Sequence, residues 1–199
     1  MTVTYLLVQV ISIGLTVSNK IQLSSDYSKE SLPPTEDNSP VLLQASVNLR
    51  NILDVVETKQ QISLEVTLRY YWHDKRITPM QEHLKNEDSY GTYLNLHPQE
   101  REFIWMPDTF IDQAINLRKP KYYLEPSSLR VYNDSMVRYS NRMNFDVACQ
   151  MGFHKFPWDI QECRVKFESF SYSTKQITMK WLDDNSSQVT KRIKTFYFL

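Results

Sequence analysis

The chain has 199 residues, 13% of them aromatic, and a formal net charge of zero from 23 basic and 23 acidic residues. This balance gives no global electrostatic field that would attract nucleic acid, so we expect no nucleic-acid partner. Only three glycines occur, and no G-x-G-x-x-G or Walker pattern is found, which argues against a phosphate-binding glycine loop.

Residues 1–18 are predicted to be a signal peptide. The mostly apolar run from Tyr5 to Val17 is shorter than the roughly 20 residues that span a bilayer. Small residues before Ser18 suit cleavage there, although no positive charge precedes the run. The alternative is a buried first strand. A signal peptide would place the chain in the secretory pathway, where an oxidising compartment favours disulfides.

Two Asn-x-Ser tripeptides agree with secretion. They begin at Asn133 and Asn185, and both lie in turn-like stretches where a glycan could be attached. We expect both asparagines to be glycosylation sites.

After a polar, proline-containing segment over residues 19–40, the sequence predicts a folded domain over residues 41–199. In ISLEVTLRYYW, apolar residues alternate with polar ones from Ile62 to Trp72, which indicates a half-buried strand. VLLQASVNLRNIL shows the same period, with one face formed by Val41, Leu43, Ala45, Val47 and Leu49. Further strands are expected over residues 103–105, 129–132, 136–149, 163–170 and 176–181, and a helical turn or two around 79–84. Many short strands separated by turn residues predict an all-β fold, an antiparallel β-sandwich.

The only two cysteines, Cys149 and Cys163, enclose thirteen residues. A disulfide between them closes a loop of fifteen residues, worth about 3 kcal/mol in the chain-entropy model. Because the two cysteines are close in the sequence, this disulfide would mainly fix the shape of one loop. The loop tip FPWD presents two aromatic residues on a proline turn, which suggests contact with another surface. The simpler interpretation is a loop stapled for stability alone.

Several ordered motifs resemble the extracellular ligand-binding domain of the Cys-loop receptors, the pentameric ligand-gated ion channels. They are the C-x13-C loop with its Phe-Pro-x-Asp tip, Trp72-His73-Asp74, Trp105-Met106-Pro107-Asp108, Tyr139-Ser140-Asn141-Arg142 and Glu168-Ser169-Phe170-Ser171-Tyr172. The resemblance covers residues 41–199. The chain stops at FYFL, so the fold is expected to be truncated before its last strands, without loop C or the membrane helices.

The resemblance implies a ligand site between neighbouring subunits. Arg69 and Ser140 would hold a carboxylate from the complementary side, and a guanidinium suits that group. Phe170 and Glu168 would hold an ammonium group from the principal side. The resemblance adds Ser169, Tyr172 and Asp112 to the ligand-binding residues. The simpler interpretation of each residue is a solvated strand face, and Arg142 is expected to be a structural ion-pair partner.

The resemblance also implies partners and a location. The disulfide loop, through Phe156, Pro157, Trp158 and Asp159, would contact the protein's own membrane domain together with Glu57 and carry ligand binding into gating. We therefore expect a homo- or heteropentamer at the plasma membrane, with this domain on the extracellular side.

The ligand is expected to be a small amino-acid-like or amine neurotransmitter. The Glu-Ser-Phe-Ser-Tyr motif and Arg69 resemble the anion-channel branch gated by glycine, gamma-aminobutyrate or glutamate, although Thr67 and Asp112 depart from the family's usual residues. A cation-conducting member and a secreted soluble binder of the same fold remain alternatives. The four histidines lack metal-ligand spacing and no hydrolase motif occurs, so we expect no enzyme, metal or cofactor.

Overall fold

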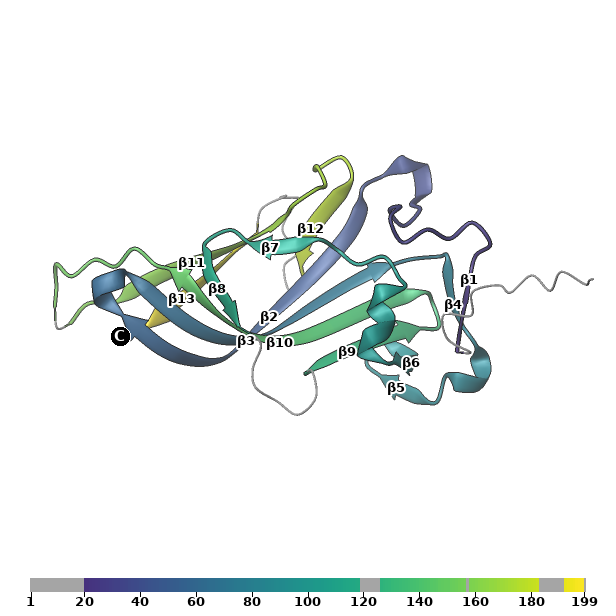
Figure 1. Cartoon of the computed structure of the whole chain (residues 1–199), viewed down its shortest axis with the longest axis horizontal. Coiled ribbons are helices and arrows are strands. Elements are labelled where there is room, and N and C mark those ends of the chain that lie inside the picture. The colour runs from purple at the N-terminus through teal and green to yellow at the C-terminus, as the bar shows by residue number, and fades with distance from the viewer. Residues whose placement is uncertain (1–19, 119–125, 157, 183–191, 199) are drawn as a thin grey trace, which may run out of the picture.

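The computed structural model describes residues 20–118, 126–156, 158–182 and 192–198, the last of these as backbone. Its strands form two packed sheets (Figure 1). The eight-stranded sheet has the order β12-β2-β3-β10-β9-β6-β5, with β8 also on β10, and the three-stranded sheet has the order β13-β11-β7. A separate pair joins β1 to β4.

The elements have the following bounds. The strands are β1 Ile21–Leu23, β2 Val41–Val56, β3 Gln61–His73, β4 Ile77–Pro79, β5 Asn86–Asp88, β6 Gly91–Leu96, β7 Thr109–Ile111, β8 Ala114–Arg118, β9 Ser127–Tyr132, β10 Met136–Ala148, β11 Gln161–Ser169, β12 Ile177–Trp181 and β13 Arg192–Phe198. The short 3-10 helices are η1 Glu36–Asn38, η2 Glu57–Lys59, η3 Gln81–His83 and η4 Pro98–Glu102.

The predicted all-β sandwich is confirmed, with one departure from antiparallel pairing. Strand β12 runs parallel to β2, with Ile177 beside Val41. The other strand pairs within the described residues are antiparallel. Period-two patterns report which residues face the core, and they do not report the direction of the neighbouring strand.

The core lies between the two sheets. On β3 the alternating residues Ile62, Leu64 and Val66 are completely buried, as their period predicts. They share the core with Phe167 from β11 in the opposite sheet. The alternation of β2 fails at Leu49, which is 37% exposed, because a register shift follows it in the pairing with β3.

The prediction of a strand at residues 103–105 is wrong. Helix η4 ends just before this stretch, and the chain then runs through a turn and a bend. Ile104 and Trp105 are nevertheless buried, which accounts for their apolar character. The Trp105 N–H donates to the Tyr27 hydroxyl at 2.7 Å instead of to a strand partner. The expected helical turn around 79–84 is confirmed as η3.

The polar segment before β2 is tied to the sandwich. Asp74 is fully buried and pairs with Arg76 at 2.8 Å. The Arg76 guanidinium also donates to the backbone carbonyls of Ser28 and Ser31 and lies over the Tyr27 ring. The aspartate of the Trp-His-Asp motif therefore anchors residues 27–31 through one arginine.

Candidate functional site

Arg69 and Ser140 lie side by side on the outer face of the large sheet. They are direct partners in the register of β3 and β10. Their neighbours Leu68 and Tyr70 are buried in the core, so alternation directs Arg69 away from it. The structure thus brings together the two residues that the sequence assigned to a carboxylate.

The Arg69 side chain carries unused hydrogen-bonding capacity. Its Nε atom is buried and has no hydrogen-bond partner in the structure. On the same face, Arg50 donates from Nε to the Thr67 hydroxyl at 3.1 Å, which places a second guanidinium on this face. Alternation along β2 places Arg50 on the polar face, but the sequence analysis did not assign it to the site, because alternation does not show which side chains of β3 it contacts across a register shift.

Arg142 has the structural role that was predicted for it. Its Nε donates to Glu65 Oε1 at 2.9 Å, linking β10 to β3. The ion pair holds the two strands that carry Ser140 and Arg69 together.

A group of tyrosines and arginines adjoins this face around one carboxylate. Asp88 accepts bonds from Arg130 at 3.0 Å, from the Tyr132 hydroxyl at 2.8 Å and from Arg138 at 3.4 Å. Burial raises the pKa of Asp88, but the hydrogen bonds from the Tyr90 N–H and Tyr132, together with the two guanidiniums, outweigh burial and lower it. Asp88 therefore stays ionised between the two arginines.

The second predicted part of the site lies at the ends of β7 and β11. Glu168 is the register partner of Phe110. The rings of Phe110 and Phe170 meet edge to face, with centroids 6.0 Å apart, and Phe170 is 83% exposed. Two aromatic rings beside a carboxylate can bind an ammonium group. Phe110 was missed because nothing in its local pattern shows which strand pairs with β7.

Asp108 holds this aromatic pair in place. Its carboxylate accepts the Ser169 hydroxyl and the Ser171 N–H, each at 2.6 Å, and its backbone carbonyl accepts the Phe170 N–H at 3.3 Å. The Tyr172 hydroxyl accepts a bond from Trp105 Nε1 at 3.3 Å. Ser169 and Tyr172 are thus engaged in the scaffold, and ligand contact by either stays a prediction.

Asp112 directly follows β7, two residues after Phe110. Its carboxylate is exposed and pairs with Lys166 Nζ at 3.5 Å. Its N–H donates to the Lys166 carbonyl. The neighbouring cation offsets the negative charge that was predicted to attract a ligand, and the ligand role of Asp112 stays a prediction.

The two halves of the predicted site lie on different outer faces. Arg69 points outward from the eight-stranded sheet, whereas Glu168 and Phe170 belong to the outer side of the three-stranded sheet, on which Phe167 faces the core. The hydrophobic core separates them. One ligand therefore cannot touch both halves within a single chain.

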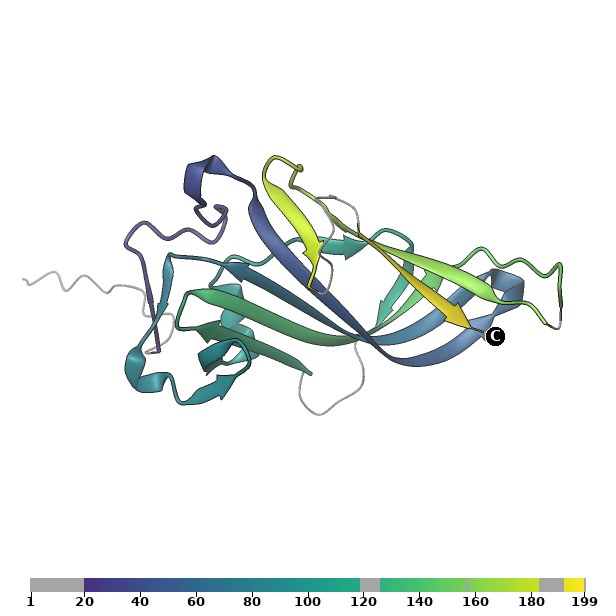
Figure 2. The same ribbon diagram turned by 180° about the vertical axis from the view of Figure 1, so that it is seen from behind.

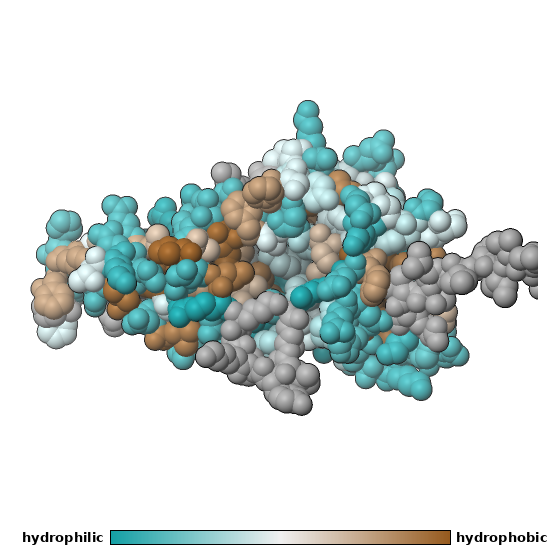
Figure 3. All heavy atoms as spheres, in the orientation of Figure 1, coloured by the Kyte–Doolittle hydropathy of each residue, from teal (hydrophilic) through white to brown (hydrophobic). Residues whose placement is uncertain are grey.

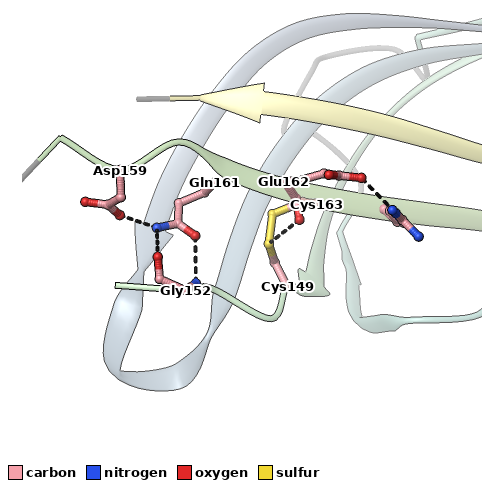
Figure 4. Close-up of a disulfide and its surroundings, with 7 residues drawn as sticks. Cys149, Gly152, Asp159, Gln161, Glu162 and Cys163 are labelled. Atoms are coloured by element: carbon pink, nitrogen blue, oxygen red, sulfur yellow. Dashed lines mark hydrogen bonds and ion pairs between the residues drawn. A yellow bond between two sulfur atoms is a disulfide. The ribbon is translucent and has the colours of Figure 1, made fainter. Parts of the chain in front are cut away.

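The predicted disulfide between Cys149 and Cys163 is confirmed (Figure 4). Both cysteines are buried, and the Cys149 N–H donates to the Gln60 carbonyl at 2.8 Å, in the turn between β2 and β3. Gln161 bridges the loop by bonding both the N–H and the carbonyl of Gly152, and it also bonds Asp159. The base of the loop is therefore fixed at two levels.

The tip of the loop projects into solvent. Phe156 is 77% exposed and Trp158 is 86% exposed. Both ribbon views place the tip at the same end as the turn of η2 that contains Glu57 (Figures 1 and 2). The structure thus brings together the residues assigned to coupling, except Pro157, which lies outside the described residues. An open groove of about 750 Å³ lies beside the disulfide, lined in part by Lys59, Gln113 and Arg164.

Other predictions from the sequence concern the chain surface and its termini. Asn133 is exposed, and its side-chain oxygen accepts a bond from Gln81 at 2.8 Å. Glycosylation there stays a prediction. Asn185 and the signal peptide lie outside the described residues.

The described residues contain neither a cluster of metal-binding side chains nor a membrane-spanning helix. In that part of the chain, no group of three or more His, Cys, Asp or Glu side chains could hold a metal ion. None of its helices has the length and apolar character needed to cross a membrane.

Comparison with known proteins agrees with this arrangement. Residues 19–199 match the family described as Neurotransmitter-gated ion-channel ligand binding domain, and the chain belongs to this family. It is therefore a receptor domain and not an enzyme, as predicted.

Three curated relatives are similar to this chain. Gamma-aminobutyric acid receptor subunit theta of Mus musculus is 27% identical over 80% of this chain and 24% of the relative. The glutamate-gated chloride channel of Drosophila melanogaster is 26% identical over 78% and 33%. Gamma-aminobutyric acid receptor subunit pi of Bos taurus is 26% identical over 88% and 39%. The chain thus spans between a quarter and two fifths of the length of these relatives.

Proposed function

We propose that this chain is the extracellular neurotransmitter-binding part of a pentameric ligand-gated ion channel at the plasma membrane. The observation that carries the proposal is the placement of Arg69 and Ser140 on one outer face and of Glu168 and Phe170 on the other. A ligand that needs both sets must lie between two subunits, with one face supplied by each.

The chemistry of the two faces favours a zwitterionic ligand. A guanidinium with a neighbouring hydroxyl suits a carboxylate, and Arg69 supplies the stronger, charge-assisted contact. The Phe110 and Phe170 rings beside Glu168 suit an ammonium group. A small amino acid carries both groups. A choline-type ligand has no carboxylate and would leave Arg69 without a partner.

The apolar surface supports assembly with like subunits. In the view of Figure 3, brown, apolar residues gather in the half of the molecule where β8 lies. Ile115 and Leu117 on this strand are 52% and 66% exposed. Exposed aliphatic residues grouped on one strand are typical of a surface that a neighbouring subunit covers. We propose a homo- or heteropentamer.

The exposed loop supports coupling to a pore. Phe156 and Trp158 are held on a loop whose base is fixed by the disulfide and Gln161. A rigid base with an apolar tip can transmit movement to a surface that it touches. We infer that this surface is the membrane domain of the same receptor, with Glu57 beside it. We further propose that the pore of this receptor conducts chloride, and the similarity to a glutamate-gated chloride channel supports this proposal.

The function is tested by expressing the complete receptor polypeptide that contains this chain in oocytes. Glycine, gamma-aminobutyrate and glutamate are applied against acetylcholine and monoamines, and the reversal potential is followed while external chloride is replaced. We expect activation by an amino acid and a reversal potential that follows chloride. A response to monoamines alone would contradict the zwitterion site, and a reversal potential that follows sodium would contradict the anion assignment.

The two-face arrangement is tested by linked subunits. Two concatemers are compared, and each carries one Arg69→Ala change and one Phe170→Ala change at chosen positions in the ring. When both changes fall on one interface, the other interfaces stay intact, whereas the two changes placed at separate interfaces disable two. We expect a larger loss of agonist response in the second case. The same loss in both placements would contradict the arrangement.

A further inference from the structure

Three arginines cross the outer face of the large sheet close together. Arg138 lies two residues before Ser140 on β10, so its side chain is on the same face as Arg69, diagonally across from it. Arg130 on β9 is the direct register partner of Arg138. The three guanidiniums therefore belong to three adjacent strands, with Ser140 beside them.

The positive charge of these arginines is incompletely balanced. Of the carboxylates in the described part of the chain, Asp88 alone contacts them, through Arg130 and Arg138. Three positive charges thus face one negative charge. The side chains of Arg130 and Arg138 are only 25% and 17% exposed, so water screens this excess weakly.

Each arginine also keeps a hydrogen-bond donor without a partner. The Nε atoms of Arg69, Arg130 and Arg138 are all buried, and none has a hydrogen-bond partner in the structure. A buried donor attached to a charged group is costly to leave unpaired. The same deficit at three neighbouring guanidiniums leaves their positive charge incompletely compensated within the described part of the chain, which favours binding of an acidic group at the exposed parts of these side chains.

Arg130 and Arg138 are held in place by aromatic rings and a carboxylate. Arg138 lies over the Tyr71 ring, 5.6 Å from its centroid, and Arg130 lies over the Tyr93 ring at 4.3 Å. Asp88 bonds both guanidiniums. Aromatic stacking and a shared carboxylate reduce the entropy that each side chain would lose on binding an anion.

We propose that Arg138 and Arg130 form a second anion subsite beside Arg69, so that the ligand bound on this face carries two acidic groups, as a dicarboxylic amino acid does. The inference rests on the proposed carboxylate site at Arg69 and Ser140. Two residues along a strand span about 7 Å, so the subsites are close enough for one small ligand. The first acidic group binds Arg69 and Ser140, and the second binds Arg138 and Arg130.

The test uses two simple anions and the intact chain. Glutarate has two carboxylates, butyrate has one, and neither has an ammonium group, so neither needs a second subunit. Their affinities for the 199-residue chain are measured by ligand-observed NMR titration at constant ionic strength. The variants are Arg138→Gln and Arg69→Gln. The matched control is Arg164→Gln, on β11 in the other sheet. Thermal unfolding of each variant shows that it is folded.

We expect the native chain and Arg164→Gln to bind glutarate at least tenfold more tightly than butyrate. Arg138→Gln should remove this preference and leave butyrate affinity unchanged, whereas Arg69→Gln should weaken both anions. Equal affinities in the native chain, or a preference that survives in folded Arg138→Gln, would overturn the second subsite alone. Unchanged binding of both anions in folded Arg69→Gln would instead overturn the proposed carboxylate site.

Discussion

The Ser169 hydroxyl donates a 2.6 Å hydrogen bond to the carboxylate of Asp108, joining two segments that lie 61 residues apart. The same carboxylate accepts the Ser171 N–H, so Asp108 contacts the residues on both sides of Phe170. Asp108 therefore helps to set the position of the exposed Phe170 ring by holding the backbone around it. A ligand site built on Phe170 depends on this contact.

Asp108→Asn should destabilise the domain and loosen the loop around Phe170. Asparagine keeps one acceptor oxygen but presents an amide donor to the Ser171 N–H or the Ser169 hydroxyl. We expect a loss of about 1–3 kcal/mol in the free energy of unfolding. Denaturant unfolding measures the loss, and hydrogen exchange at Ser171 locates it. Asp112→Asn, at an exposed carboxylate, is the control and should change stability by less than about 0.5 kcal/mol. Unchanged exchange at Ser171 would contradict the proposed role of Asp108.

Removing the disulfide by Cys149→Ser with Cys163→Ser should lower stability by about 3 kcal/mol, because the fifteen-residue loop is then unconstrained in the unfolded chain. The measurement is denaturant unfolding with and without a reducing agent. The native chain should lose stability on reduction, and the double variant should be insensitive to it. A native chain that unfolds identically in both conditions would argue against a stabilising bridge.

Stability should fall in acid partly through Asp88. Its pKa is lower in the folded chain than the usual unfolded value of about 3.9. The carboxylate therefore contributes stability that is present above about pH 4 and is lost as the pH falls through its folded pKa. Asp88→Asn should cost about 1–3 kcal/mol at pH 6, since it leaves Arg130 and Arg138 without their carboxylate.

The measurement is the free energy of unfolding between pH 2 and pH 6. The Asp88→Asn variant should show a shallower decline below pH 4 than the native chain. Asn86→Ala, at an exposed residue of the same strand that carries no titratable group, is the control and should keep the native slope. A native slope in Asp88→Asn would show that this carboxylate does not couple to folding.

Phe170→Ala should affect ligand response and leave stability almost unchanged. The ring is 83% exposed, so its removal should change the unfolding free energy by less than about 0.5 kcal/mol. In the complete receptor, loss of a cation–π contact worth about 1–2 kcal/mol should raise the half-maximal agonist concentration roughly tenfold. Phe103→Ala, at another exposed phenylalanine, is the control. An equal shift in both variants would argue against a ligand role for Phe170.

Trp158→Ala should separate binding from gating. The side chain is 86% exposed at the loop tip and contributes little to the fold. We expect ligand affinity to stay within twofold of the native receptor, while the maximal current falls severalfold. Radioligand binding and oocyte currents measure the two effects. Leu42→Ala, at an exposed leucine outside the loop, should change neither. A Trp158→Ala receptor with a native maximal current would contradict the coupling role.

Much of the candidate site could be predicted from the sequence, because its residues lie in short motifs with recognisable spacing. The cysteine pair, Arg69 with Ser140, and Arg142 as an ion-pair residue were all predicted, and the structure confirms the disulfide, the adjacency and the ion pair. Phe110 was not predicted, because its role depends on β7 pairing with β11.

The alternation of polar and apolar residues by itself determined that the chain forms half-buried strands, since each strand buries every second side chain whatever its neighbours are. The order of those strands was decided only by the tertiary structure. This order places Arg130, Arg138 and Arg69 on adjacent strands, with Asp88 in contact with the first two. It also pairs β12 with β2 in parallel. The physical reason is that a period of two fixes the face on which a side chain lies, whereas its cross-strand partner depends on a register set by residues far away in the chain.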